Sequence, residues 1–486
     1  MKFTNLIRKR MNLNLKDPDE SNQFRPKSGI FFTALGGAEE IGMNLNLYGT
    51  DDSWIMIDLG VTFDSRMDSG SDIIMPNPEF ILQNKDKLKG LVLTHAHEDH
   101  IGAVPYFFEE LDCPIYATAF TASVLERKIR ELGISINIPI HVVPTNGNME
   151  IGPFNLEFFS VTHSIPDPSA VLLRTKFGNI FHTGDWKFDN EPTIGKPTDI
   201  TSLKKIGDEG ILALVCDSTN IFESGSSGSE GSLFNSLDKL IKQRKFGRII
   251  VSCFSSNVAR LKTISKVAKK NNRNVVLVGR SMWRFYQAAK DNGYLNNVDE
   301  FLNDDCLSSF KNEETLIICP GSQGDFRAAL YKIAFDKNKN ISVGKGDLVI
   351  FSSKRIPGNE ISIDRIQDRF ASKGVEVITE DDAFVHVSGH PSRDELALMY
   401  SYLRPKIVIP VHGEEKHIKE HVKFALACQI PDAVGIANGD VVKIAPGKPR
   451  KISSVKSGRL ILAGKELFPL EKENYREERE SLKTNL

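Results

Sequence analysis

The chain has 486 residues, 40% hydrophobic and 26% charged, which is typical of a soluble globular protein too long for one ordinary core. Its formal net charge of -1 excludes a global basic field for nucleic acid, although a local groove could still bind phosphates. No apolar run approaches the roughly 18 residues of a membrane-spanning helix, and the six cysteines are scattered without a Cys-x-x-Cys pair, as expected of buried thiols in a reducing compartment.

Residues 1–28 are expected to form a flexible basic leader. They contain Arg8, Lys9 and Arg10 but lack the apolar core of a secretory signal. An organelle transit peptide is the alternative, because residues 1–16 are basic and poor in acids. No membrane association is expected, and the cytoplasm is the expected location.

The most informative stretch lies in the first predicted domain, whose apolar strands alternate with turns. His95-x-His97-x-Asp99-His100 directly follows the apolar run 91–93, and residues 101–108 favour the start of a helix. Side chains on such a strand-to-helix turn can point at a common centre, and imidazole with carboxylate suits Zn²⁺. The cluster offers more ligands than one tetrahedral ion with an open position would take, which suggests two metals. A solvated, histidine-rich loop is the alternative.

Three further ligand-type residues follow apolar runs. His163 comes after the strand-like residues 154–160, Asp185 after 180–184, and His412 after 406–411. Taken alone, His163 or His412 would be read as a structural histidine. Their shared setting at strand ends, where a sheet can fix the direction of a side chain, favours ligands instead.

The candidate ligands are separated by a long segment of different character. Fully apolar runs at residues 247–252, 274–279, 315–319 and 347–352 alternate with helical stretches, which indicates a parallel sheet covered on both faces. Histidines then return at His386, His390 and His412. This order predicts a domain inserted within another, with the site in the cleft between them.

These motifs resemble the metallo-β-lactamase fold, through His95 to His100 followed in order by His163 and Asp185. The insert, His386-Val387-Ser388-Gly389-His390 and Pro410-Val411-His412-Gly413-Glu414 are similar to the β-CASP nucleic-acid hydrolases, and residues 36–44, 253–260, 320–324 and 357–360 to bacterial ribonuclease J. The resemblance implies an α/β fold, in which a metallo-β-lactamase αββα sandwich carries an inserted β-CASP α/β domain with a mainly parallel sheet. The predicted domains are the metallo-β-lactamase part at 29–221, the β-CASP domain at 222–383 and the return segment at 384–465.

The resemblance implies a role for each matching residue around two divalent ions, with Zn²⁺ expected and Mn²⁺ or Mg²⁺ as alternatives. His95, His97 and His163 would hold one ion, Asp99, His100 and His412 the second, and Asp185 would bridge both. Asp58 would orient a metal-bound imidazole, or is a turn aspartate at a strand end. Asp217 would orient a ligand or His390.

The same resemblance implies a phosphodiester substrate and a departing 3′ oxygen. His390 would donate the proton to that oxygen, while His386, Ser388 and Gly389 would bind the phosphate; a buried core pair of histidines is the alternative. Loops after insert strands would line the channel for a 5′ monophosphate, although each glycine signal alone is weak. Their residues are Gly321, Ser322, Gly358, Asn359 and Arg280. Phe63 would stack on a base or belong to the core.

The chain also departs from the family pattern. Residues 466–486 are expected to be a charged tail with the family's C-terminal domain absent, so the expected homodimer would be weaker. The loop at 324–326 contains Gly-Asp-Phe where the family leads us to expect Gly-Glu-Pro.

The sequence therefore predicts a metal-dependent ribonuclease in RNA processing and decay. It would cut single-stranded RNA to 5′-phosphate products, as a 5′-to-3′ exonuclease preferring 5′-monophosphate ends and as an endonuclease. The alternatives are a small-molecule metallohydrolase, which has no use for the insert, a non-catalytic RNA-binding subunit, which would have lost ligands, and a DNA-directed β-CASP enzyme.

Overall fold

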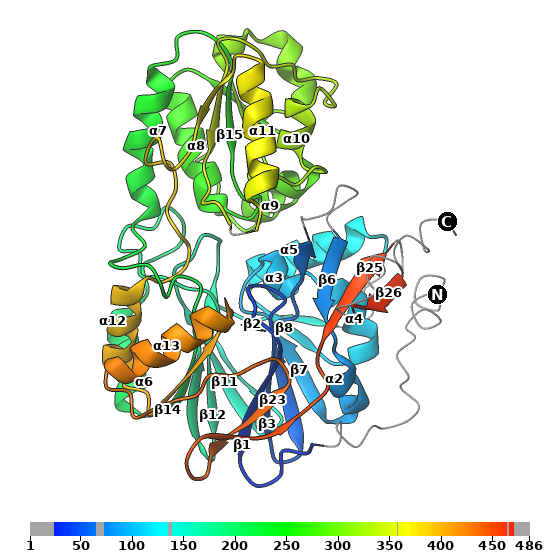
Figure 1. Cartoon of the computed structure of the whole chain (residues 1–486), viewed down its shortest axis with the longest axis vertical. Coiled ribbons are helices and arrows are strands. Elements are labelled where there is room, and N and C mark those ends of the chain that lie inside the picture. Colours follow the sequence, from blue (N-terminus) through cyan, green and yellow to red (C-terminus); the bar gives the residue numbers. More distant parts are fainter. Residues whose placement is uncertain (1–23, 65–71, 135–138, 357, 464–465, 471–486) are drawn as a thin grey trace.

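A computed structural model describes residues 24–64, 72–134, 139–356, 358–463 and 466–470, and it has two lobes, one above the other (Figure 1). Most of the predicted leader (residues 1–23) and of the predicted tail (residues 471–486) lies outside these ranges. Within them, no helix combines the length and the apolar character needed to cross a lipid bilayer.

The lower lobe is built on two large sheets packed face to face. The strands of the first, in order across the sheet, are β24 (Arg450–Ser454), β23 (Asp440–Ala445), β1 (Ile30–Gly36), β3 (Leu45–Thr50), β4 (Ser53–Ile57), β7 (Leu88–Val92), β8 (Ile115–Ala117) and β9 (Ile140–Val142). Those of the second are β10 (Asn148–Ile151), β11 (Phe154–Ser160), β12 (Ser169–Thr175), β13 (Gly178–His182), β14 (Ile211–Asp217), β20 (Ile407–Val411) and β22 (Asp432–Ala433).

Alternation along each strand divides the apolar side chains between two cores. In β1 and β4, Phe32 and Ile55 point into the core between the sheets, whereas Phe31 and Trp54 point outward to the helices. Because both faces of these strands are covered, the strands read as continuous apolar runs rather than as alternating ones.

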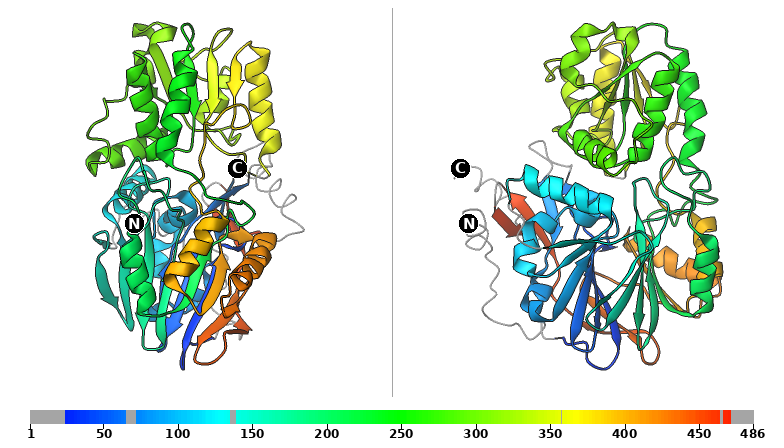
Figure 2. Two further views of the ribbon diagram at one scale, coloured as in Figure 1. Left: turned by 90° about the vertical axis from the view of Figure 1, so that its left-hand side faces the viewer. Right: turned by 180° about the vertical axis from the view of Figure 1, so that it is seen from behind.

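Helices cover the outer face of each sheet (Figure 2). The first sheet carries α2 (Glu79–Gln83), α3 (Glu98–Ile101), α4 (Val104–Leu111) and α5 (Ala119–Glu131), and the second carries α6 (Ile200–Asp208), α12 (Arg393–Leu403) and α13 (Glu415–Ala427). The predicted αββα sandwich is thus confirmed. The helix expected to start within residues 101–108 is divided into α3 and α4, with Gly102 and Ala103 between them.

The upper lobe is a separate five-stranded sheet in which every neighbouring pair is parallel. Its order is β16 (Asn274–Leu277), β17 (Thr315–Cys319), β15 (Ile249–Ser252), β18 (Leu348–Phe351) and β19 (Glu376–Ile378). One face is covered by α7 (Leu233–Lys242), α8 (Val258–Lys270) and α9 (Arg280–Asp291), and the other by α10 (Ala329–Ala334) and α11 (Glu360–Ser372). This confirms the expected parallel sheet between two helical layers.

Arg260 in α8 joins the two chain segments that connect the lobes. Its guanidinium is fully buried, pairs with Glu230 on the way into the upper lobe and donates to the carbonyl of Val385 on the way out (3.2 Å). It also donates to the carbonyl of Ser352 at the end of β18 (2.8 Å). The carboxyl end of the sheet is thereby fastened to both connections.

A short strand lies at the start of the predicted tail. Residues Glu466–Pro469 form β26, which pairs with β25 (Arg459–Ala463), because Leu467 is buried and Phe468 packs on a small apolar cluster. With β6 (Asp72–Pro76) and β5 (Thr62–Asp64) they make a four-stranded sheet, and a short parallel pair joins β2 (Ala38–Glu39) to β21 (Gly413–Glu414).

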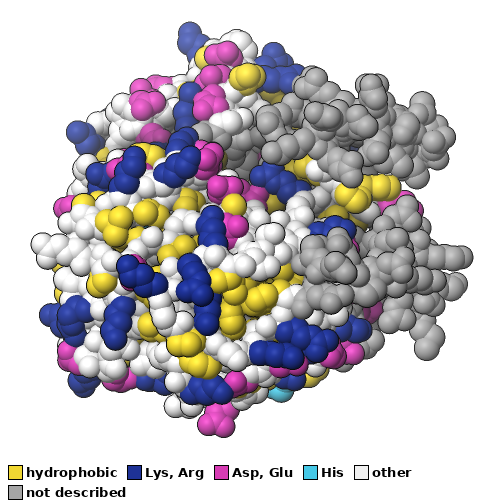
Figure 3. Space-filling model, turned by 60° about the horizontal axis from the view of Figure 1, so that its bottom comes forward, with side chains coloured by type: hydrophobic (Ala, Val, Ile, Leu, Met, Phe, Trp, Pro, Cys, Tyr) yellow, Lys and Arg dark blue, Asp and Glu magenta, His cyan; other side chains and the backbone are white. Residues whose placement is uncertain are grey.

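Charges of both signs are mixed on the lower face of the molecule, where Lys and Arg lie among Asp, Glu and hydrophobic side chains (Figure 3). That mixture agrees with the net charge of -1. The described part of this face therefore presents no extended patch of one sign.

Candidate metal centre

The loop that carries His95, His97, Asp99 and His100, here called the metal loop, follows the carboxyl end of β7 in the first sheet. Thr94 closes the strand by donating its N–H and its hydroxyl to the two carboxylate oxygens of Asp58 (2.8 Å each). His97 is the residue before α3, and the short helix carries Asp99 and His100 back toward His95. The turn therefore directs all four ligand-type side chains to one side.

The first group of converging atoms comes from His95, His97, His163 and Asp185, whose ligand atoms all lie within 4.8 Å of one another. Nδ1 of His97 is 3.0 Å from Nε2 of His95 and 3.1 Å from Nε2 of His163. Ligands of one tetrahedral Zn²⁺ at about 2.1 Å lie about 3.4 Å apart. The spacing fits a single ion at this position.

The second group comes from Asp99, His100, Asp185 and His412. Nε2 of His412 is 3.0 Å from Oδ2 of Asp99, and Nε2 of His100 is 3.2 Å from Oδ2 of Asp185. The backbone of His412 is held by its N–H, which donates to the carbonyl of Gly37 (2.6 Å) beside the β2–β21 pair.

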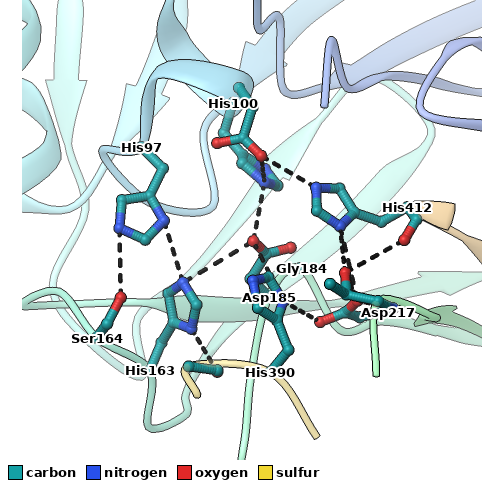
Figure 4. A network of polar contacts seen from close by, with 12 residues as sticks. His97, His100, His163, Ser164, Gly184, Asp185, Asp217, His390 and His412 are labelled. Carbon is teal, nitrogen blue, oxygen red and sulfur yellow. Dashed lines mark hydrogen bonds and ion pairs between the residues drawn. The ribbon is translucent and has the colours of Figure 1, made fainter. Parts of the chain in front are cut away.

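Asp185 belongs to both groups and also to a third one with Asp217, His390 and His412, and histidines surround it in Figure 4. Its Oδ2 is buried and faces Nε2 of His100 at 3.2 Å, Nε2 of His95 at 3.7 Å, and Nε2 of His163 and Nδ1 of His390 at 3.8 Å each. An oxygen so placed fits a ligand shared by two cations.

Charges in the site divide the histidines into two kinds. Burial lowers the pKa of His95, His163 and His97, the last to about 4, so these imidazoles are neutral, as metal ligands must be. Burial also acts against the charged forms of His100 and His412, but Asp185 and neighbouring carboxylates raise their pKa values well above normal. Protons on these two histidines balance the buried carboxylates, a charge that a bound cation would supply.

Each of three ligand histidines has its second ring nitrogen fixed by a partner, as metal-bound imidazoles usually have. Nδ1 of His100 lies 2.7 Å from Asp58, Nδ1 of His163 lies 2.6 Å from the carbonyl of Gly389, and Nδ1 of His412 lies 2.7 Å from the hydroxyl of Thr219. The structure thus places Asp58 against His100, whereas Thr219 was missed by the sequence analysis. Its position two residues after Asp217 was the available signal.

Asp217 lies at the end of β14 and connects two histidines. Its Oδ2 is 2.7 Å from Nδ1 of His390, and its Oδ1 accepts from the N–H (2.9 Å) and the hydroxyl (2.7 Å) of Thr219. Burial lowers the pKa of His390, but Asp217 and Asp185 raise it above the normal value overall. The two carboxylates therefore favour the protonated form of this imidazole.

The return segment places three more predicted residues beside His390. Ser388 Oγ accepts from Asn220 (2.7 Å) and from the N–H of His390 (3.2 Å), which leaves its own hydrogen to donate. His386 Nδ1 is buried without a partner in the described residues, and burial, with the cations of Arg260 and Lys354 nearby, lowers its pKa well below normal. Gly389 leaves room for His163, since an added Cβ would lie 2.6 Å from its ring.

The remaining predicted residues do not converge on the metal groups. Four of them occupy loops at the carboxyl end of the upper sheet: Gly321 and Ser322 after β17, and Gly358 and Asn359 before α11. Ser322 lines a small hollow with Ser353, Lys354 and Arg355. Arg280 is exposed at the start of α9, and Phe63 on β5 is 50% exposed, which argues against the core alternative.

Three family models match consecutive parts of the chain. They are "Metallo-beta-lactamase superfamily" at residues 44–244, "Ribonuclease J, beta-CASP domain" at 246–370 and "Zn-dependent metallo-hydrolase RNA specificity domain" at 374–425. A solved protein of unknown function from Enterococcus faecalis V583 shares the fold, with a TM-score of 0.59 and 16% identity over 85% of this chain and 99% of its own.

Similarity over about 90% of the chain is found with proteins named Ribonuclease J. That of Sinorhizobium meliloti is 42% identical over 439 residues, which is 90% of this chain and 78% of the relative. That of Helicobacter pylori J99 is 37% identical over 447 residues, or 91% of this chain, and that of Mycobacterium tuberculosis H37Rv is 36% identical over 441 residues. The chain spans 64% of the Helicobacter protein, less than two thirds.

Proposed function

The chain belongs to the ribonuclease J family, a group of ribonuclease hydrolases in the metallo-β-lactamase superfamily, and we propose that it cuts single-stranded RNA to 5′-phosphate products with two divalent ions. The observation that carries this proposal is the double ligand set that shares Asp185. The RNA specificity model over residues 374–425 supports RNA as the substrate.

Two divalent ions, when bound, would supply an acidified water and neutralise charge on the attacked phosphodiester. His95, His97 and His163 would hold one ion, Asp99, His100 and His412 the other, and Asp185 both. Asp58 and Thr94 keep Nε2 of His100 directed into the site through the contact at Nδ1. Zn²⁺ is the ion we propose, because histidines and carboxylates together suit a borderline metal, although Mn²⁺ also accepts such ligands.

The return segment would bind the phosphate and serve the leaving group. His386, Ser388 and Gly389 offer a ring N–H, a hydroxyl and a backbone N–H to the phosphate oxygens. His390 would give its proton to the departing 3′ oxygen, and Asp217 then stabilises the correct tautomer at Nδ1 (2.7 Å). The raised pKa of His390 supports this assignment, since a general acid has to be protonated near neutral pH.

The upper lobe would select the RNA end. We propose that Gly321, Ser322, Gly358, Asn359 and Arg280 bind a 5′ monophosphate and the first nucleotides. Ser322 shares a hollow with Lys354 and Arg355, and these cations now pair with Glu223 and Asp364, carboxylates that a bound phosphate would replace. We propose that the enzyme acts as an exonuclease from such an end and also as an endonuclease.

Cellular setting and assembly are part of the same proposal. We place the enzyme in the cytoplasm and take it to be a homodimer, both on the basis of the family resemblance. The domain limits at residues 221/222 and 383/384 remain predictions of the sequence analysis.

The test compares 5′-monophosphate, 5′-triphosphate and 5′-hydroxyl ends on matched RNA and DNA strands, with Zn²⁺ or Mn²⁺ added. We expect RNA with a 5′ monophosphate to be degraded fastest, with release of 5′-phosphate products, and Asp99→Ala to be inactive. Equal turnover of DNA would favour the DNA-directed alternative. Activity that survives Asp99→Ala would refute the metal assignment.

A further inference from the structure

A salt bridge between the lobes begins in the middle of the metal loop. Glu98 lies between His97, which belongs to the first ligand group, and Asp99, which belongs to the second. Its carboxylate does not turn to the metal groups but pairs with Lys128 of α5 and, through Oε1, with Arg284 of α9 at 3.0 Å. A residue of the upper lobe thus holds the loop that carries ligands of both groups.

Arg284 is placed to make this contact specific. Its second nitrogen donates to Glu131 of α5 (2.7 Å), so the guanidinium joins two carboxylates of the lower lobe, and its side chain is only 11% exposed. The backbone of Glu98 is fixed separately, since its carbonyl accepts from the N–H groups of Val61 and Gly102. The bridge to α9 is therefore made by a residue whose backbone is already fixed within the lower lobe.

The end of α9 makes a second contact with the lower lobe. Tyr294, just after the helix, donates to Oδ1 of Asp167, whose Oδ2 accepts from the N–H of Phe120 at the start of α5 (3.4 Å). The rings of Tyr294 and Phe120 also meet edge to face, with 6.0 Å between centroids. Asp167 follows the loop of His163, so α9 reaches segments next to both ligand groups.

The start of the same helix carries the predicted phosphate ligand Arg280. Arg280 and Arg284 are four residues apart, so they share one helix face and are separated by about 6 Å along the axis. Figure 1 shows α9 at the lower side of the upper lobe, directly above α5 and α3. Fixing Arg284 to Glu98 also fixes Arg280 relative to the metal groups.

We propose that Arg284 is a positioning residue, whose bridge to Glu98 sets the place of the upper lobe relative to the metal centre. RNA that contacts both lobes depends on this bridge, whereas a small phosphodiester bound only at the metal centre does not. This inference rests on the proposed function for its substrate but not for its structural content.

The test compares Arg284→Met with Lys290→Met. Lys290 lies on the same helix and pairs with Glu300 within the upper lobe, on the surface, so its replacement is the matched control. Each variant is assayed with a 5′-monophosphate RNA and with bis(p-nitrophenyl) phosphate, and its zinc content is measured. For Arg284→Met we expect kcat/KM for RNA to fall at least about 10-fold, because small misplacements in a site are costly. Its zinc content and ester hydrolysis should stay within about twofold, as should both activities of the control.

Arg284→Lys should recover part of the RNA activity, because lysine keeps the positive charge. The recovery should be incomplete, because a lysine can reach only one of the two carboxylates. Tyr294→Phe removes only a hydroxyl and should also lower RNA cleavage selectively. It is the substitute test if Arg284→Met does not fold. Equal losses on RNA and ester, or no loss on either, would overturn the inference.

Hydrogen exchange separates this inference from the proposed function. If the wild-type enzyme hydrolyses the ester but no RNA, the proposed function fails, and exchange still decides the role of the bridge. Arg284→Met should then raise exchange in residues 98–102 and 280–291 more than Lys290→Met does. The same exchange in both variants would overturn the inference.

Discussion

The hydroxyl of Thr219 links a metal-site histidine to a buried carboxylate, and its removal gives a measurable prediction. With Nε2 of His412 directed at the metal group, Nδ1 carries the proton and donates to Thr219 Oγ1 at 2.7 Å, and that hydroxyl donates to Oδ1 of Asp217 at 2.7 Å. Thr219→Val keeps the shape of the side chain but leaves the Nδ1–H without its acceptor.

The size of the effect follows from the geometry. An unsatisfied buried donor costs about 1–3 kcal/mol, which corresponds to about 5- to 150-fold in an equilibrium constant. Oδ1 of Asp217 is 3.6 Å from the same Nδ1 and can take over part of the bond after a small shift. We therefore expect Zn²⁺ binding to weaken by about 10-fold, at the lower end of measured losses for such supporting residues.

The assay is titration of the metal-free protein with Zn²⁺ in competition with a chromophoric chelator. Thr219→Ser keeps the hydroxyl and is the matched control, with wild-type affinity expected. A melting temperature for each variant shows whether the fold is retained. Wild-type affinity in Thr219→Val, or equally weak binding in both variants, would refute the reasoning.

Three further predictions concern other parts of the molecule. Gly389→Ala would place a Cβ 2.6 Å from the ring of His163, so zinc content and RNA cleavage should fall by about 10- to 100-fold. Arg260→Met leaves the Glu230 carboxylate buried without its partner, so unfolding free energy from denaturant titration should fall by about 3–5 kcal/mol, and adding Glu230→Gln should recover part of it. Burial lowers the pKa of His421 to about 4, so the unfolded chain, with a histidine pKa near 6.5, takes up protons that the folded chain refuses. The stability present above pH 6.5 should therefore decrease as the pH falls toward 4, by up to about 3 kcal/mol, and less steeply in His421→Gln.

Controls and contradicting results differ among these three. Gly344→Ala adds a Cβ with no heavy atom within 4 Å and should leave zinc content unchanged; full metal content in Gly389→Ala would contradict the clash. A stability loss in Arg260→Met that the second substitution deepens would show that the buried charge is not its cause. If the unfolding free energy depended equally on pH in wild type and His421→Gln, His421 would not be the cause of that dependence.

The succession of apolar runs, turns and ligand-type residues along the sequence made the fold and much of the candidate site predictable. The strands are apolar runs with turns at their ends, and the ligand-type residues stand at those ends, so the sequence alone is enough to select His95, His163 and His412. The family matches confirm the resemblance and the fold class. The structure also brings the two ligand groups together, while the individual roles stay proposals.

Contacts between distant segments could not be predicted in this way. Glu98 reads as an ordinary exposed acid in a helix turn, and its partner Arg284 is 186 residues away. Arg260 reads as a surface cation of a helix, yet it is fully buried because Glu230 and two carbonyls surround it. The strand β26 was missed because its partner β25 had not been predicted as a strand.

The order of the ligands along the chain has a consequence for synthesis on the ribosome. The four residues of the first group all lie between positions 95 and 185, whereas the second group needs His412 at the end of β20. β20 is also an inner strand, between β14 and β22, so the second sheet is complete only when it arrives. Domains generally fold as they emerge. A nascent chain therefore completes the second sheet and gains the second group only after most of the protein has been made.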